Sequence, residues 1–251
     1  SRLSSGSEAF VPRALVRSER AAATLRGGAS DASLDLVVGD YTDVDALADA
    51  MQGCRQVAHF VGIIKESAAA SYESAHEATC GPISQAAARA GVERIVYLSI
   101  LGSTPDHANR CLASKGRAEE ILLAGSVPTT VLRVPMVIGE GDFAANALRR
   151  QALSKRVALV GGGRTRQQPI DALDVIGAVV AAFTRSGPGG LALDLGGPEN
   201  LSHRELVARA ARVLGQPDAP RVLSIPRWFM QGVAAVAGRV SANPPITSDM
   251  L

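Results

Sequence analysis

The segments RIVYLS at residues 94–99, KGRAEEILLA at residues 115–124 and TTVLRVP at residues 129–135 decide the fold class. The first and third are short and rich in β-branched residues, which is typical of strands buried on both faces of a sheet. The segment between them has helical spacing. A strand, a helix and a second strand predict a βαβ unit, in which the strands are parallel and the crossover is right-handed.

The same alternation continues upstream of this unit. We expect strands at residues 11–17, 34–38 and 56–61, and helices at residues 18–26, 44–51 and 72–90. Ser18 is placed to cap the first helix, and the Gly81-Pro82 pair predicts an interruption of the last one. The pattern therefore predicts an α/β fold with a doubly wound parallel sheet of the Rossmann class.

After about residue 140 the rhythm changes. We expect a dinucleotide-binding core over residues 1–140, to which residues 167–200 return, and a smaller substrate-side lobe over most of residues 141–251. Helices are predicted at residues 143–152, 175–183, 202–214 and 228–240, with a strand at residues 191–195. Asp174 is expected to cap the second helix, and Ser202 with Glu205 forms a capping box on the third.

Two segments of this second half have alternative readings. Residues 161–166, GGGRTR, are expected to form a solvated loop, although an arginine there can hold a substrate phosphate. The apolar helix that begins at Trp228 is expected to dock on the body of the protein, with another subunit or a membrane surface as the alternatives.

Composition excludes several classes of function. The net charge is +2, from 26 basic and 24 acidic residues, which gives no electrostatic case for nucleic acid. The three cysteines and four histidines show no metal-ligand spacing, so no metal is expected. No apolar stretch reaches the roughly 18 residues of a transmembrane segment, and no signal-peptide pattern is present, so we expect a cytoplasmic protein.

The beginning of the chain bears on the cofactor. A dinucleotide fold normally opens with a strand and a Gly-rich turn, which leads into the first helix. The chain begins Ser-Arg-Leu-Ser-Ser-Gly-Ser, so we expect that strand and that turn to be absent from it. The helix N-terminus that would hold the pyrophosphate cannot be located, and the cofactor prediction therefore rests on later positions.

A series of motifs occurs in a specific order along the chain: LVR at 15–17, VGDYTD at 38–43, AHFVG at 58–62, RIVYLSILG at 94–102, CLASK at 111–115, LRVP at 132–135 and QQPIDALDV at 167–175. Together they resemble the atypical and extended short-chain dehydrogenase/reductases. The resemblance is greatest to bacterial relatives of the NADPH-binding accessory subunit of respiratory complex I, and NmrA-like and sugar-nucleotide epimerase proteins are more distant. It implies a dinucleotide partner and allows peripheral association with a membrane complex.

The adenosine end of the cofactor is predicted at the second strand of such a fold. Arg17 ends this strand, where a basic residue can pair with a 2′-phosphate, so Arg17 with Ser18 favours NADP(H) over NAD(H). The resemblance implies that Asp40 meets the adenine amino group and that Tyr41 lies against the ring. A solvated arginine and a turn aspartate are the structural alternatives.

The residues that would contact the rest of the cofactor are predicted at the ends of the following strands. Gly62 would let the backbone approach the ribose and phosphates, with Phe60 and Val61 on the same wall. The resemblance further implies that the nicotinamide ring packs against three consecutive residues that follow the strand after Lys115, namely Val134, Pro135 and Met136.

The catalytic motif of the superfamily is Tyr-x-x-x-Lys on a helix, and here its spacing survives as Cys111-x-x-x-Lys115. Lys115 is expected to remain a cofactor contact. Cys111 is interpreted as a silent replacement, because a thiol is shorter than a phenol by most of a ring. Ser99 is the nearest candidate for the family's Ser or Thr, unless that position falls at Leu101.

These residues leave three hypotheses for function. The first is an NADP-dependent oxidoreductase or epimerase that acts on a small carbonyl or sugar-like substrate. The second is a catalytically silent NADP(H)-binding accessory or sensor protein of a larger assembly, which the lost tyrosine favours. The third is a scaffold that binds no nucleotide and offers only a surface for a protein partner or a second copy.

Overall fold

A computed structural model describes residues 10–28, 34–185, 187, 189–230 and 232. Its main sheet has four parallel strands in the order β10-β5-β4-β3. These strands are β3 (Gln56–His59), β4 (Arg94–Ile100), β5 (Thr129–Val134) and β10 (Leu191–Asp194). The predicted βαβ unit is confirmed, because β4 and β5 pair in parallel and α4 (Arg110–Leu123) connects them.

A second parallel pair of strands opens the chain. β1 (Arg13–Val16) pairs with β2 (Asp35–Val38), and α1 (Glu19–Gly28) connects them. Within the described residues this pair shares no strand hydrogen bonds with the main sheet. Leu15 and Val57 nevertheless pack on one hydrophobic core, and the Arg13 guanidinium donates to two carbonyls of the connection that leads into β3.

Helices cover both faces of the main sheet because the side chains of β4 alternate. Ile95 and Tyr97 face α2 (Val44–Ala50), α3 (Cys80–Arg89) and α4, whereas Val96 and Leu98 face α6 (Ala172–Thr184). Ile95, Val96 and Tyr97 are buried and Leu98 is half-buried, so the middle of the strand packs on both faces. The doubly wound α/β prediction is confirmed.

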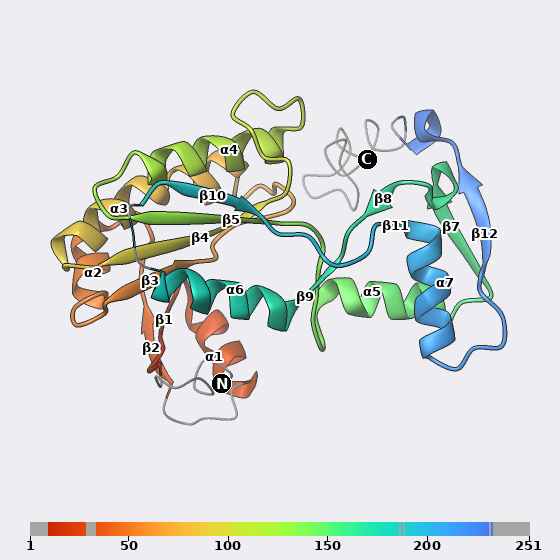
Figure 1. Ribbon diagram of the computed structural model, residues 1–251, viewed down its shortest axis with the longest axis horizontal. Coiled ribbons are helices and arrows are strands. Elements are labelled where there is room, and N and C mark those ends of the chain that lie inside the picture. The colour runs from red at the N-terminus through yellow and green to blue at the C-terminus, as the bar shows by residue number, and fades with distance from the viewer. Residues whose placement is uncertain (1–9, 29–33, 186, 188, 231, 233–251) are drawn as a thin grey trace.

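The smaller part of the molecule lies to the right in Figure 1. α5 (Phe143–Ala152) and α7 (His203–Val213) pack against a parallel pair formed by β7 (Arg156–Val160) and β12 (Arg221–Ile225). The hydrophobic core of this smaller part contains Val157, Leu159 and Val207. Short pairs link it to the sheet: β6 (Val137–Ile138) with β9 (Ile170–Asp171), and β8 (Arg166–Gln167) with β11 (Leu201–Ser202).

Several predicted helix boundaries are corrected by the structure. The chain over residues 72–90 is interrupted at residues 78–79, between a π-helical turn η1 (Glu73–Glu77) and α3. Pro82 instead lies in the first turn of α3, where its missing N–H costs nothing. α4 begins five residues before the predicted start at Lys115, because Asn109 caps it by accepting from the Leu112 N–H.

Two predictions for the second half are also corrected, and a third falls mostly outside the described residues. Asp171 and not Asp174 caps α6, since its carboxylate accepts from the Leu173 N–H at 2.7 Å. Residues 161–166 are not a plain loop, because they contain the 3-10 turn η2 (Gly161–Gly163) and the start of β8. Most of the predicted helix 228–240 lies outside the described residues, so its docking stays a prediction; at its start Trp228 is 73% exposed and Met230 is buried.

Candidate functional site

The predicted cofactor positions follow the carboxyl ends of parallel strands. Arg17 comes directly after β1, Asp40 follows β2, and Gly62 follows β3. Strands that run in parallel end at the same edge of a sheet, and ligands of open α/β folds bind outside that edge. Arg17 and Asp40 therefore lie at the carboxyl end of the β1–β2 pair, and Gly62 lies at the carboxyl end of the main sheet.

The β1–β2 end combines an exposed arginine with an aspartate. Asp40 accepts hydrogen bonds from the Thr42 N–H and hydroxyl at 2.9 and 2.8 Å, and these bonds hold the pKa of its carboxyl below the usual range, with a smaller contribution from the Arg17 charge. The Tyr41 hydroxyl donates to the Leu15 carbonyl, and burial raises its pKa. Ser18 caps α1 as predicted, accepting from the Ala21 N–H.

Gly62 lies close to the Lys115 amine and the His76 ring. A Cβ at this residue would lie 3.1 Å from the Lys115 amine and 3.4 Å from the His76 ring. The amine therefore comes close to the backbone that follows β3. Phe60 is 58% exposed and Val61 is half-buried, so the two side chains face different surroundings.

Lys115 lies almost entirely inside the protein, at 5% exposure. Its amine donates to the Tyr97 hydroxyl and to the Leu98 carbonyl, both at 3.0 Å. Burial lowers its pKa from 10.5 to about 8, while the nearby cysteine side chains act in the opposite direction. An ammonium has three N–H donors, so two are engaged by the protein and one remains to meet a ligand hydroxyl.

Two histidines surround the lysine and were not predicted. The His76 Nε2 atom lies 3.0 Å from both the N–H and the carbonyl oxygen of Ile63, and its Nδ1 is a buried atom without a hydrogen-bond partner in the described structure. His59 stacks on Tyr97 with the ring centroids 5.1 Å apart. Burial, assisted by the Lys115 charge, lowers the pKa of His59 to about 3 and that of His76 to about 4, so both are neutral at physiological pH.

The two candidate groups for proton transfer are engaged in other contacts. Cys111 is buried in the first turn of α4, and its thiol lies 3.8 Å from the Ile63 carbonyl oxygen. The Ser99 hydroxyl donates to Glu119 at 2.5 Å and is 2% exposed. Glu119 in turn accepts from Arg133 of β5 at 2.6 Å. Ser99 therefore belongs to a buried polar network that connects β4, α4 and β5.

The predicted nicotinamide wall is largely structural. Val134 is buried in a core cluster with Ile170 and Val175. Its carbonyl accepts from the Leu101 N–H, and the carbonyl of Met136 accepts from the Ile170 N–H. Pro135 and Met136 are half-buried, so they are the members of this segment with surface left to offer a ring.

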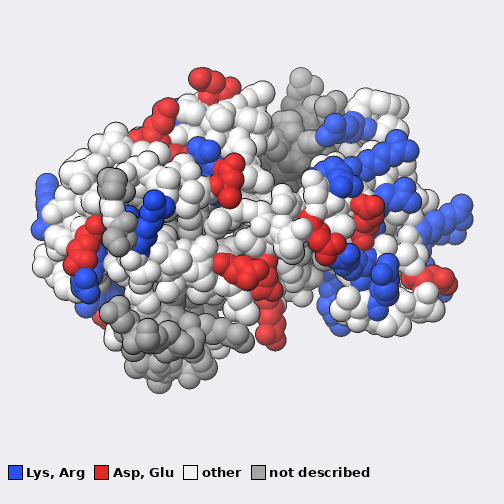
Figure 2. All heavy atoms as spheres, in the orientation of Figure 1, with Lys and Arg blue, Asp and Glu red and all other residues white. Residues whose placement is uncertain are grey.

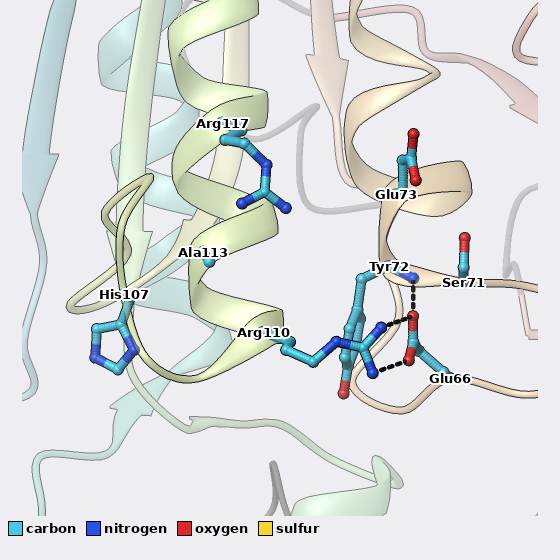
Figure 3. A pocket seen from close by; sticks show the side chains of 8 residues that line it. All are labelled: Glu66, Ser71, Tyr72, Glu73, His107, Arg110, Ala113 and Arg117. Carbon is cyan, nitrogen blue, oxygen red and sulfur yellow. Dashed lines mark hydrogen bonds and ion pairs between the residues drawn. The ribbon is translucent and has the colours of Figure 1, made fainter.

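A small cavity lies beside α4 (Figure 3). Its volume is about 200 Å³, and its walls come from α4, η1 and the loops that precede these two helices. The Arg110 guanidinium pairs with Glu66 at 2.8 Å and lies over the Tyr72 ring. This cavity is small for a dinucleotide. Its wall residue Tyr72 stacks on His76 with the ring centroids 5.6 Å apart, so the cavity adjoins the residues around Lys115.

Comparison with known proteins places the chain in a family. A family described as NAD(P)H-binding matches residues 3–168, which is more than half of the chain. The chain belongs to this family. It is an NAD(P)-binding protein of the atypical short-chain dehydrogenase/reductase type, with a Rossmann fold, as the motif order predicted.

Two curated relatives of this NAD(P)H-binding chain have names that state a role. It is 27% identical over 202 residues to subunit 9 of the alpha subcomplex of mitochondrial NADH dehydrogenase from Arabidopsis thaliana, covering 78% of this chain and 49% of the relative. It is 32% identical over 136 residues to a (4-alkanoyl-5-oxo-2,5-dihydrofuran-3-yl)methyl phosphate reductase from Streptomyces griseus, covering 54% and 47%. The chain spans about half the length of the curated relatives it matches.

Solved structures agree with the fold of this NAD(P)H-binding chain. A UDP-N-acetylglucosamine 4-epimerase from Bacillus cereus matches with a TM-score of 0.68 at 18% identity, covering 85% of this chain and 76% of the other. An NAD-bound dTDP-glucose 4,6-dehydratase from Streptomyces venezuelae matches with a TM-score of 0.67 at 20% identity, covering 82% and 71%.

In the part of the chain that the structure describes, the helices are too short or too polar to cross a membrane.

Proposed function

We propose that this protein holds NADP(H), in preference to NAD(H), at a site that does not carry out ordinary dehydrogenase chemistry. The observation that carries the proposal is the state of the two proton-transfer positions. Cys111 is buried beside the Ile63 carbonyl, and the Ser99 hydroxyl is committed to Glu119. The site retains the lysine of the family motif and lacks the tyrosine that would move a proton.

Arg17 and Lys115 have different roles in this proposal. The exposed Arg17 guanidinium pairs with the 2′-phosphate, which NADP(H) has and NAD(H) lacks. The third donor of the Lys115 amine binds a hydroxyl of the nicotinamide ribose beside Gly62. The bound dinucleotide would supply hydride chemistry, whereas this chain binds and orients it. Such a protein serves as an accessory or sensor in a larger assembly, as the name of the Arabidopsis relative suggests.

A reductase is the second candidate, and one observation favours it. The pKa of Lys115 is lowered to about 8, so its amine can release a proton near neutral pH. The substrate class would be a small carbonyl compound, in line with the name of the Streptomyces relative.

The test begins with the purified protein in its full length, without added cofactor. One sample is denatured, and the released nucleotide is identified by mass spectrometry. NADPH and NADH are titrated against a second, native sample. We expect NADPH to bind at least about tenfold more tightly, since one charge-assisted pair contributes about 1.5–3 kcal/mol. Arg17→Ala removes the preference, and the matched Arg20→Ala, exposed on α1, keeps it.

Activity decides between the two candidates. Bound NADPH that is retained, but not oxidised by a panel of aldehydes, ketones and lactones, supports the silent binder. Turnover that is lost in Lys115→Met identifies a reductase instead. Equal affinity for NADPH and NADH in the wild type would contradict the role of Arg17.

A further inference from the structure

The near-neutral net charge conceals a strong separation of charge along the chain. Residues 143–168 and 199–230, which build most of the smaller part, contain eleven basic and three acidic residues, while the remaining residues contain 15 and 21. All eleven basic side chains are exposed. Figure 2 shows lysines and arginines gathered over this part of the molecule, on the right of the view. Such asymmetry indicates an anionic partner for this part alone.

Few of these cations are neutralised within the protein. Arg166 pairs with Glu205 at 3.5 Å, and Arg209 pairs with Glu199. Eight others form no ion pair with a described residue: Arg149, Arg150, Lys155, Arg156, Arg164, Arg204, Arg212 and Arg221. The positive field of this part is therefore directed to the outside.

The strand pair β7–β12 concentrates this charge. Arg156 and Arg221 are register partners at the start of the two parallel strands, so their side chains leave the same face of the pair. Both are exposed, and Lys155 precedes the first of them. Like charges placed opposite each other on neighbouring strands repel, and an anion bound between them reverses that penalty. The arrangement costs stability in the isolated protein and favours binding to a negative surface.

Apolar side chains lie exposed along the same segment. Leu223 follows Arg221 by two residues, so it points to the same face of β12, and it is 44% exposed. Immediately after the strand, Trp228 and Phe229 are 73% and 50% exposed and contact each other edge to face. Leu223 and the two rings lie on and just beyond the same strand as Arg221, so a partner that is both anionic and partly apolar would satisfy the cations and these side chains together.

We propose that this surface, formed by Lys155, Arg156, Arg221, Leu223, Trp228 and Phe229 and called here the basic-aromatic face, docks on an anionic phospholipid bilayer. The cations bind lipid phosphates, and the indole and phenyl rings enter the boundary between headgroups and acyl chains, where tryptophan is favoured. A nucleic acid would satisfy the cations, but it would leave Leu223 without an apolar environment. The docking is peripheral and independent of the dinucleotide site.

The chain contains a single tryptophan, so Trp228 reports on its own environment. The protein is mixed with vesicles of phosphatidylcholine alone, or of phosphatidylcholine with phosphatidylglycerol, at low and high salt. We expect a blue shift of the fluorescence and co-sedimentation with the anionic vesicles only, both reversed by high salt because exposed charges are screened. No response to anionic vesicles would overturn the proposal.

Two charge reversals of equal size then test the location. Arg156→Glu with Arg221→Glu is expected to reduce partitioning onto anionic vesicles at least about 20-fold, since each basic residue near such a surface contributes about fivefold. Arg20→Glu with Arg26→Glu, exposed on α1, changes the net charge equally and keeps near wild-type partitioning. Equal losses in both variants would refute a localised face.

Two further measurements complete the test. Trp228→Ser with Phe229→Ser, which removes exposed rings only, is expected to weaken co-sedimentation about tenfold or more, and unchanged co-sedimentation overturns their role. A duplex oligonucleotide that binds more tightly than the vesicles would assign the face to nucleic acid and overturn the proposal. NADPH affinity, measured for each variant, keeps failure of this proposal distinct from failure of cofactor binding.

Discussion

Burial of the Lys115 amine predicts how the free energy of unfolding depends on pH. Its pKa is lowered from 10.5 to about 8, principally by burial. Each pKa unit corresponds to about 1.4 kcal/mol, so at neutral pH the charged amine costs the folded protein about 3 kcal/mol without a cofactor. Lys115→Met removes this cost but also leaves the Tyr97 hydroxyl without its present partner, a penalty of about 1–2 kcal/mol that does not vary with pH in this range.

The pH dependence isolates the electrostatic part of the effect. Between pH about 8 and 10.5 the folded protein has lost the Lys115 proton, while the unfolded chain still holds it. The unfolded state then binds more protons, so this group makes the free energy of unfolding rise with pH across the window. Below pH about 8 the contribution is a constant cost, and above 10.5 it disappears. Lys115→Met lacks this rise.

The measurement is urea unfolding, followed by circular dichroism, at a series of pH values for the wild type and Lys115→Met. We expect the wild type to gain about 3 kcal/mol relative to the variant from neutral pH to about pH 10.5, since other titrating groups cancel in the difference. Lys155→Met provides the control, because Lys155 is exposed and its removal leaves the curve parallel to the wild type. A difference between wild type and Lys115→Met that stays constant with pH would refute the burial argument.

Three further substitutions test the fold by thermal or urea unfolding. Arg133→Met leaves the buried Glu119 carboxylate without its cation and is expected to cost about 3–5 kcal/mol. Gly116→Ala places a Cβ 2.3 Å from the backbone carbon of Thr104, so the connection before α4 must move, at a cost of about 3 kcal/mol. Ser202→Ala removes the capping box of α7 and is expected to cost about 1 kcal/mol.

Each of these substitutions has its own control. Adding Glu119→Gln to Arg133→Met is expected to recover part of the loss, and no recovery would mean that the arginine acts through packing. Gly81→Ala lies in α3 with nothing within 4 Å, so it is expected to be neutral or stabilising, in contrast to Gly116→Ala. A loss in Ser202→Ala that exceeds about 2 kcal/mol would mean that the side chain contributes more than its cap.

Local patterns in the sequence were sufficient for the class of fold. The strands β4 and β5 and the helix between them follow from hydrophobic spacing, which records how each segment is buried. The capping box of Ser202 and Glu205 follows from a short motif, because both partners lie within one helical turn. Helix ends were less predictable: Asp171 and Asp174 are both good caps, and only the path of the backbone decides between them.

The candidate site depends on contacts that no local pattern contains. Lys115 was predicted from its motif, but its contacts with Tyr97, Gly62 and His76 join different strands and helices. Its depressed pKa is a consequence of burial, which only the assembled sheet and helices produce.

The basic-aromatic face shows the same division. The sequence by itself determined the alternation of strands and helices, the family motifs and the excess of arginine in the second half, because each is a property of neighbouring residues or of composition. Only the tertiary structure decided that Arg156 and Arg221 are partners on one face, with Leu223 beside them and Trp228 in solvent. Pairing of β7 with β12 joins segments that are distant in the chain, and strand register is set by packing in three dimensions.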